Sequence, residues 1–259
     1  MDNKDIWRIG MEQSAIDFNC SASDFIKRGN TVVISGLNDG AKKCYKKPMF
    51  CDFAYYGNGL VASVDEQIKE FITKFINKNS GFRSFDTPQL IILNKEFEKY
   101  GKWVCHMAEF FLPDIEKQVT INGNIDVKVL LEQDIPDLYN DDRFHMALGY
   151  GNDISKTDVL AVTGYVDGNI AGVAGASNDC DTMWQIGIDV LPEYRKLGVA
   201  STITKILTDE IIKRGKVPFY CTAWSNIPSK NNAIKCGYKT AWVEMAAKDI
   251  YEAMKIIEG

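Results

Sequence analysis

One stretch of this chain, Ile188-Asp-Val-Leu-Pro-Glu-Tyr-Arg-Lys-Leu-Gly-Val-Ala-Ser201, constrains its fold more than any other. An apolar strand pattern ends near Val190, and Pro192 has no N–H group with which to continue a sheet. The pattern Arg195-x-x-Gly198-x-Ala200 follows and opens directly into an amphipathic helix over 198–214. The sequence therefore predicts a sharp turn from a strand into the exposed N-terminus of a long helix.

Such a turn can hold a diphosphate. A helix N-terminus presents unpaired N–H groups and a partial positive charge, and glycine or alanine lets phosphates approach the backbone closely. Arg195 adds a charged donor, and Ser201 adds a hydroxyl group. The same pattern also fits an ordinary strand-to-helix turn with a surface arginine. Other phosphate-binding patterns, G-x-x-x-x-G-K-[ST] and G-x-G-x-x-G, do not occur.

A second motif follows at a matching distance and resembles a short helix of the GNAT superfamily of N-acetyltransferases. Its residues are Asn226, Ser229, Ala233, Lys235, Gly237 and Tyr238. Together with the Arg195 turn it makes residues ~124–247 similar to that superfamily, and the whole chain resembles bacterial members with an additional N-terminal domain. The resemblance implies an α/β fold with a mixed sheet, and acetyl-CoA as the acyl donor to an amine.

The resemblance also implies which residues bind the donor. Ile188 and Val190 would pair with its pantothenyl arm through their backbone groups, between two strands that move apart. Its diphosphate would lie on the turn made by Arg195, Lys196, Leu197, Gly198, Val199, Ala200 and Ser201. Asn226 and Ser229 would lie on the far side of the donor.

Catalytic groups are harder to assign. Asp189, Tyr238 and His145 are the candidates for proton transfer, and Glu193, Glu244 and Tyr220 are alternatives; each also fits a packing or surface role. Family members often carry a tyrosine where this chain has Ala233, so the group that protonates the leaving thiolate is open. A protein that binds acyl-CoA as a sensor or scaffold without turnover is the alternative.

We predict an N-terminal α/β domain over 1–122 and a GNAT domain over 123–259. The first is either a degenerate GNAT-like layout or a separate lid or dimerisation domain, and it lacks the phosphate turn. Within it, Ser63 and Glu66 suggest a capping box before a helix, and Gln89–Leu93 suggests a strand. Within the second, the Asp167-Gly168 pair predicts a hairpin between strands at 158–166 and 169–176.

The amino-acid composition limits the classes of molecule that this protein is expected to bind. A net charge of −5 and a pI of about 5.2 argue against general binding to nucleic acid or anionic membranes. Seven cysteines without a C-x-x-C pair predict reduced thiols and no metal site, and with no secretory pattern they favour the cytoplasm. A homodimer is left open.

Overall fold

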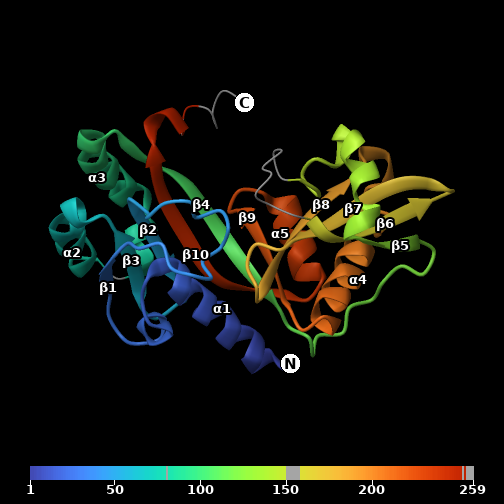
Figure 1. Cartoon of the computed structure of the whole chain (residues 1–259), viewed down its shortest axis with the longest axis horizontal. Helices are drawn as coiled ribbons and strands as arrows, with labels where there is room; N and C mark the ends of the chain where they lie inside the picture. The colour runs from blue at the N-terminus through green and yellow to red at the C-terminus, as the bar shows by residue number, and fades with distance from the viewer. Residues whose placement is uncertain (80, 150–157, 253, 255–259) are drawn as a thin grey trace. The chain divides into compact units, whose positions relative to one another are not determined.

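The structure is a computed structural model that describes residues 1–79, 81–149, 158–252 and 254 (Figure 1). The chain forms two compact units and passes between them more than once. Unit 1 contains Met1–Gly10, Lys42–Cys44 and Phe111–Thr240; unit 2 contains Met11–Ala41, Tyr45–Phe110 and Ala241–Gly259. These units are defined by contacts in space. The predicted boundary between an N-terminal domain (1–122) and a C-terminal domain (123–259) is a division along the sequence, and it stays a prediction.

Unit 1 is built on a mixed sheet with the strand order β4-β9-β8-β7-β6-β5. Its strands are β4 (Lys102–Pro113, from Phe111 onward), β5 (Asp126–Leu131), β6 (Asp158–Val166), β7 (Asn169–Ser177), β8 (Met183–Val190) and β9 (Val217–Ala223). Strands β5 to β8 pair antiparallel in succession, and β8 pairs with β9 in parallel. The predicted hairpin between β6 and β7 is confirmed: Asp167 and Gly168 both have positive φ, as a type I′ turn requires.

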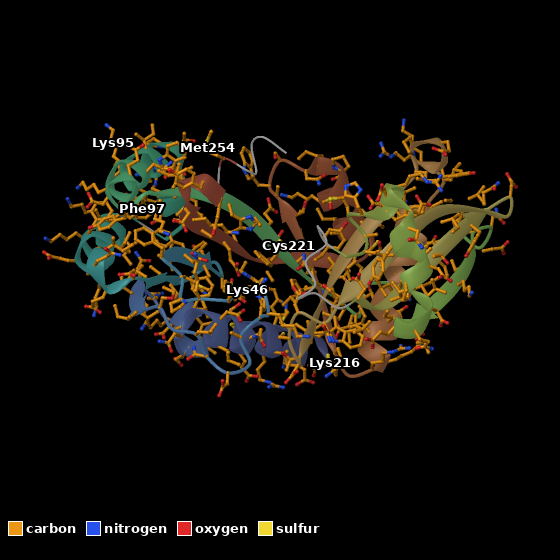
Figure 2. All side chains as sticks on the ribbon, turned by 45° about the horizontal axis from the view of Figure 1, so that its top comes forward. Lys46, Lys95, Phe97, Lys216, Cys221 and Met254 are labelled. Atoms are coloured by element: carbon orange, nitrogen blue, oxygen red, sulfur yellow. The ribbon has the colours of Figure 1, made fainter. Side chains whose placement is uncertain are left out.

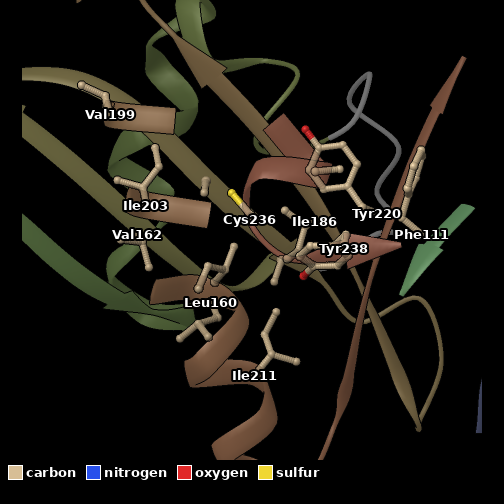
Figure 3. Close-up of a cluster of buried hydrophobic side chains, with 14 of the residues drawn as sticks. Phe111, Leu160, Val162, Ile186, Val199, Ile203, Ile211, Tyr220, Cys236 and Tyr238 are labelled. Carbon is tan, nitrogen blue, oxygen red and sulfur yellow. The ribbon is translucent and has the colours of Figure 1, made fainter. Parts of the chain in front are cut away.

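Two helices and their apolar residues form the core of unit 1 (Figure 3). They are α4 (Val199–Lys213) and α5 (Ile227–Lys235). Ile203 and Ile211 of α4 are fully buried and lie in one cluster with Val162 and Ile186 of the sheet. A second cluster of buried side chains includes Ile135, Phe144 and Leu191. Two short 3-10 helices, η6 (Pro136–Asn140) and η7 (Asp142–Phe144), lie in the segment that contributes to it.

Unit 2 has the strand order β1-β3-β2-β10-β4. Its strands are β1 (Thr31–Ile34), β2 (Cys51–Tyr55), β3 (Leu60–Val64), β10 (Tyr238–Asp249, from Ala241 onward) and the first part of β4. Helices α2 (Lys69–Asn77) and α3 (Thr87–Phe97) pack on this sheet around Phe53 and Ile72. Phe97 of α3 is buried in this cluster, whereas Lys95 of the same helix is exposed (Figure 2).

Two local predictions in unit 2 are wrong. Gln89–Leu93 lies inside α3, because Asp86 and Pro88 provide a helix start and a short apolar run suits either element. Ser63 is not a cap but a fully buried residue of β3; Asp65 caps η2 (Glu66–Ile68) instead, accepting a hydrogen bond from the Gln67 N–H group.

The N-terminal region also contains α1 (Asn3–Phe18) and the 3-10 turns η1 (Ala22–Phe25), η3 (Gly81–Phe85) and η4 (Glu98–Tyr100). In the described part of the chain, no helix is both long enough and apolar enough to cross a bilayer. The predicted class, a mixed α/β fold with helices on the sheets, is confirmed.

Candidate functional site

Strands β8 and β9 of unit 1 pair over only part of their length. The parallel register runs from the Met183–Val217 pair to the Ile186–Tyr220 pair, while β8 continues to Val190 and β9 to Ala223. On its other edge, β8 stays paired with β7 as far as Val190. Among the described residues, no strand pairs with the second edge of Gly187–Val190, so backbone groups are left open there.

The open groups belong to Ile188 and to the N–H of Val190, because the Val190 carbonyl oxygen accepts a hydrogen bond from Arg195 Nε at 3.4 Å. The Leu191 N–H group donates to the carbonyl oxygen of Ala171 at 3.0 Å, so Leu191 turns its backbone toward β7. Successive residues of an antiparallel strand turn their N–H and C=O groups to opposite edges. Ile188 and Val190 therefore turn theirs away from β7. The geometry matches the backbone role that the resemblance implies for these two residues.

The turn after β8 leads to a helix start without a side-chain cap. Lys196 and Gly198 have φ values of +66° and +88°, and α4 begins at Val199. Ser201 donates its hydroxyl hydrogen back to the Gly198 carbonyl, and no described side chain accepts a hydrogen bond from the first N–H groups of α4. Arg195 and Lys196 are exposed and form no ion pair with a described residue. The turn thus combines N–H groups that have no side-chain acceptor with two exposed cations, of which Arg195 donates from Nε to the Val190 carbonyl.

Asn122 holds this turn in place. Its side-chain amide donates to the Leu197 carbonyl at 2.8 Å, and its backbone N–H group donates to the hydroxyl of Thr202 at 3.0 Å. Sequence analysis did not find this residue, since it lies in a polar stretch that indicates only a break between elements. No local signal points from residue 122 to a helix that begins far later in the chain.

The second motif forms the start of α5. Asn226 is its N-cap, and its side-chain oxygen accepts a hydrogen bond from the Ser229 N–H group at 3.2 Å. Ser229 donates its hydroxyl hydrogen to the phenol oxygen of Tyr220 at 3.0 Å. Tyr220 is the last residue of β9 that pairs with β8, so both predicted residues of this motif lie beside the point where the strands part.

Asp189 and His145 lie on the side of the sheet opposite α4. One carboxylate oxygen of Asp189, Oδ2, accepts hydrogen bonds from the N–H groups of Met146 and Ala147 at 2.8 and 2.9 Å. Desolvation raises the pKa of Asp189, although these two N–H groups oppose the shift. His145 is exposed, and its Nδ1 lies 2.7 Å from the Asp142 carbonyl oxygen; no described residue forms a hydrogen bond with its Nε2. The structure therefore brings these two candidates near each other.

The double hydrogen bond predicts a stabilising role for Asp189. Replacing Asp189 by alanine removes the acceptor of the Met146 N–H group and one of the two acceptors of the Ala147 N–H group, which also donates to the Phe144 carbonyl at 3.0 Å, and we expect a loss of about 1–2 kcal/mol of unfolding free energy. Asp189→Asn keeps a carbonyl oxygen at the same place and should lose less than half as much. Urea unfolding of both variants measures the difference. Equal losses in both variants would contradict this anchoring role.

The structure places the other candidates elsewhere. Tyr238 is 1% exposed, its hydroxyl lies 2.7 Å from that of Thr208 in the core, and burial raises its pKa well above the ordinary range. Ala233 is fully buried. Glu193 is exposed in η9 (Pro192–Tyr194), and Glu244 belongs to unit 2.

Two parallel strands that part beside an uncapped helix N-terminus agree with the layout that the resemblance to N-acetyltransferases implies. Residues 181–246, which contain β8, α4, β9 and α5, match the family described as FR47-like protein. This chain therefore carries a GNAT-type domain. No curated protein matches the sequence.

Several solved structures resemble the chain at low identity. A GCN5-related N-acetyltransferase-like protein from Streptococcus suis is 14% identical, with 63% of this chain and 68% of that chain covered and a TM-score of 0.44. A GCN5-related N-acetyltransferase from Kribbella flavida is 14% identical, with coverages of 61% and 63% and a TM-score of 0.44. The aminoglycoside N-acetyltransferase AAC(6')-Iy in complex with CoA is 21% identical, with coverages of 45% and 92% and a TM-score of 0.35. The chain thus spans about two thirds of the length of the first two.

Proposed function

We propose that this chain is an acyltransferase that moves an acetyl group from acetyl-CoA to a primary amine by direct attack. The observation that carries the proposal is the coincidence of two open features in unit 1. The unpaired edge of β8 at Ile188 and Val190 runs directly into the turn that ends at the uncapped start of α4. An elongated molecule with amide groups and a diphosphate has complementary chemistry at both places.

The residues of the turn fit a diphosphate. Gly198 has an added Cβ position no closer than 3.4 Å to a neighbour, and its left-handed backbone orients the N–H groups that follow it outward. Arg195 and Lys196 would supply positive charge, and Leu197, Val199, Ala200 and Ser201 would supply backbone N–H groups. Asn226 and Ser229 would border the thiol end of the donor. Bound there, acetyl-CoA supplies an activated acetyl thioester.

Proton removal from the attacking amine is assigned to Asp189 or His145. Asp189 Oδ2 accepts hydrogen bonds from two N–H groups, but no described residue bonds to Oδ1, and burial raises the pKa of Asp189, which makes its carboxylate a stronger base. His145 has its Nε2 available. The N–H group of Val190 on the open edge would donate to the developing oxyanion. Tyr238 is too deeply enclosed to exchange protons readily, so solvent would protonate the departing thiolate.

If the Asp189 carboxylate is the general base, turnover has a defined pH dependence. Because the folded-state pKa is raised, the carboxylate is protonated and inactive below that value, and kcat/KM should fall as pH drops through it. We expect Asp189→Asn to lower kcat/KM about 100-fold or more and to remove this limb of the profile. The release of free thiol from acetyl-CoA measures it, with a panel of diamines, aminoglycosides and lysine peptides. If His145→Gln alone removes the limb, His145 is the base.

A non-catalytic role as an acyl-CoA sensor or scaffold is the second candidate. It is favoured by Ala233, which is fully buried and offers no proton donor where family members often have a tyrosine. Saturable acetyl-CoA binding without amine-dependent thiol release across the whole panel would support the sensor. Amine-dependent release would eliminate it.

The remaining proposals concern context. We assign acetyl-CoA binding to residues 123–259 alone, with 1–122 as an accessory domain, and expect a cytoplasmic protein that binds neither nucleic acid nor membranes. Whether it forms a homodimer is a matter for sedimentation measurements.

A further inference from the structure

The turn before α4 has no apolar anchor of its own. Arg195, Lys196 and Leu197 are all exposed, and the first buried residue after them is Val199. Lys196 has a φ of +66°, a left-handed conformation that is unfavourable for any residue other than glycine. Polar contacts must therefore hold these three residues in their conformation.

Asn122 makes the shortest of these polar contacts. Its side-chain amide donates to the Leu197 carbonyl oxygen at 2.8 Å. Arg195 donates to two carbonyl oxygens, from its backbone N–H group to Pro192 at 3.3 Å and from Nε to Val190 at 3.4 Å. Because hydrogen bonds weaken with length, the side chain of Asn122 is the main polar support of the turn.

Asn122 is itself fixed by three further hydrogen bonds. Its backbone N–H group donates to the hydroxyl of Thr202 in α4 at 3.0 Å. Its Oδ1 accepts a hydrogen bond from the Asn124 N–H group at 3.1 Å, and its carbonyl oxygen accepts one from the Ile125 N–H group at 3.2 Å. Ile125 is buried in the same apolar cluster as Val199 of α4. The amide of Asn122 therefore has a defined direction relative to the start of this helix.

The bond to Leu197 also orients the N–H group that follows. The Leu197 carbonyl and the Gly198 N–H group belong to one planar trans peptide, in which C=O and N–H point in opposite directions. Because Asn122 holds the carbonyl on its own side, the Gly198 N–H group points away from Asn122. No described residue accepts a hydrogen bond from this N–H group. The same bond keeps the negative end of the carbonyl dipole away from the side on which an anion would lie.

We propose that Asn122 is a positioning residue for the diphosphate of acetyl-CoA. It fixes the Leu197–Gly198 peptide with the N–H group turned toward the donor, and this prior orientation raises the affinity of the turn for the diphosphate. The inference rests on the proposed function, because the diphosphate is that of the acyl donor. Asn122 acts through Leu197 and Gly198 without contacting the donor, and it precedes the segment 123–259 that is assigned to donor binding.

Isothermal titration of the full-length protein with acetyl-CoA tests the proposal. Asn122→Ala removes the donor to Leu197 and should weaken binding about tenfold, which corresponds to about 1.4 kcal/mol. Asn122→Asp keeps an acceptor for the Asn124 N–H group but loses the donor, and it should weaken binding at least as much. The matched control is Asn124→Asp, which adds the same charge at an exposed side chain that makes no hydrogen bond with the turn. It should bind within about twofold of the parent protein.

The amide resonance of Gly198 separates orientation from a general loss of structure. In protein labelled with ¹⁵N-glycine, this resonance is the one that Gly198→Ala removes. Hydrogen bonds to anions are short and strong, and such a bond moves an amide proton downfield. The Gly198 resonance should therefore move downfield when acetyl-CoA saturates the parent protein, and should fail to do so in saturated Asn122→Ala.

Two results would overturn the proposal. One is an affinity within about twofold of the parent in both Asn122→Ala and Asn122→Asp. The other is a downfield shift of the Gly198 resonance that persists in Asn122→Ala. If circular dichroism shows Asn122→Ala unfolded, Asn122→Asp carries both measurements, since it retains the bond to Asn124. A parent protein that does not bind acetyl-CoA would reject the donor site itself, whereas unchanged binding in the variants rejects only the role of Asn122.

Discussion

Replacing Gly198 by glutamate is expected to weaken acetyl-CoA binding about 100-fold or more, a loss of about 2.7 kcal/mol. Gly198 immediately precedes α4, where the first N–H groups have no side-chain cap. A carboxylate at this position would occupy those donors and repel a diphosphate. The negative charge also complements the positive end of the helix dipole, so stability should change little beyond about 1–2 kcal/mol for the left-handed backbone.

The other end of the same helix provides a matched control. Gly215 follows α4, has a φ of +74°, and has no atom within 4 Å of an added Cβ. Gly215→Glu therefore adds the same side chain and the same backbone strain without approaching the turn. Calorimetric titration with acetyl-CoA should separate the two variants. If both bind as tightly as the parent protein, the turn does not hold the diphosphate and the assigned site is wrong.

Local patterns predicted the parts of the candidate site that depend on neighbouring residues. The turn around Gly198 was predicted because its geometry follows from residue types within a few positions, whereas Asn226 was singled out only through the resemblance to a known family. The brace from Asn122 to Leu197 and the anchor from Asp189 to residues 146–147 were not predicted. Each joins segments far apart in the sequence, and only the folded sheet brings them together.

The fold, like the site, was predicted where neighbouring residues decide the structure and missed where they do not. The two strands joined by the Asp167-Gly168 turn could be predicted from the sequence, because a hairpin is a local structure. Ser63 was misread because its strand is buried on both faces, so its apolar pattern does not alternate. Its neighbour Asp65 has the better capping geometry.

Replacing Gly175 by alanine is expected to reduce the unfolding free energy by about 3 kcal/mol. A Cβ added at this position of β7 would lie 2.3 Å from the carbonyl oxygen of Ala147 and 2.5 Å from Leu148 Cδ2. The first of these is a backbone atom and cannot rotate away, so the segment that follows η7 must move. At about 2–4 °C per kcal/mol for a protein of this size, the melting temperature should fall about 6–12 °C.

Gly123 serves as the control, because an added Cβ there meets no atom within 4 Å and Gly123→Ala should melt within about 1 °C of the parent. An equal effect of both substitutions would show that close packing at Gly175 is not the cause.

A double variant tests the physical mechanism of this loss. The Ala147 residue that Gly175→Ala displaces is the one whose N–H group Asp189 holds at 2.9 Å. Once the segment has moved, that hydrogen bond is already broken, and removing Asp189 costs little more. Gly175→Ala combined with Asp189→Ala should therefore lose about 1 kcal/mol less than the sum of the single losses, as expected for residues that act on one shared contact. Strict additivity in urea unfolding would mean that β7 and Asp189 hold the segment independently.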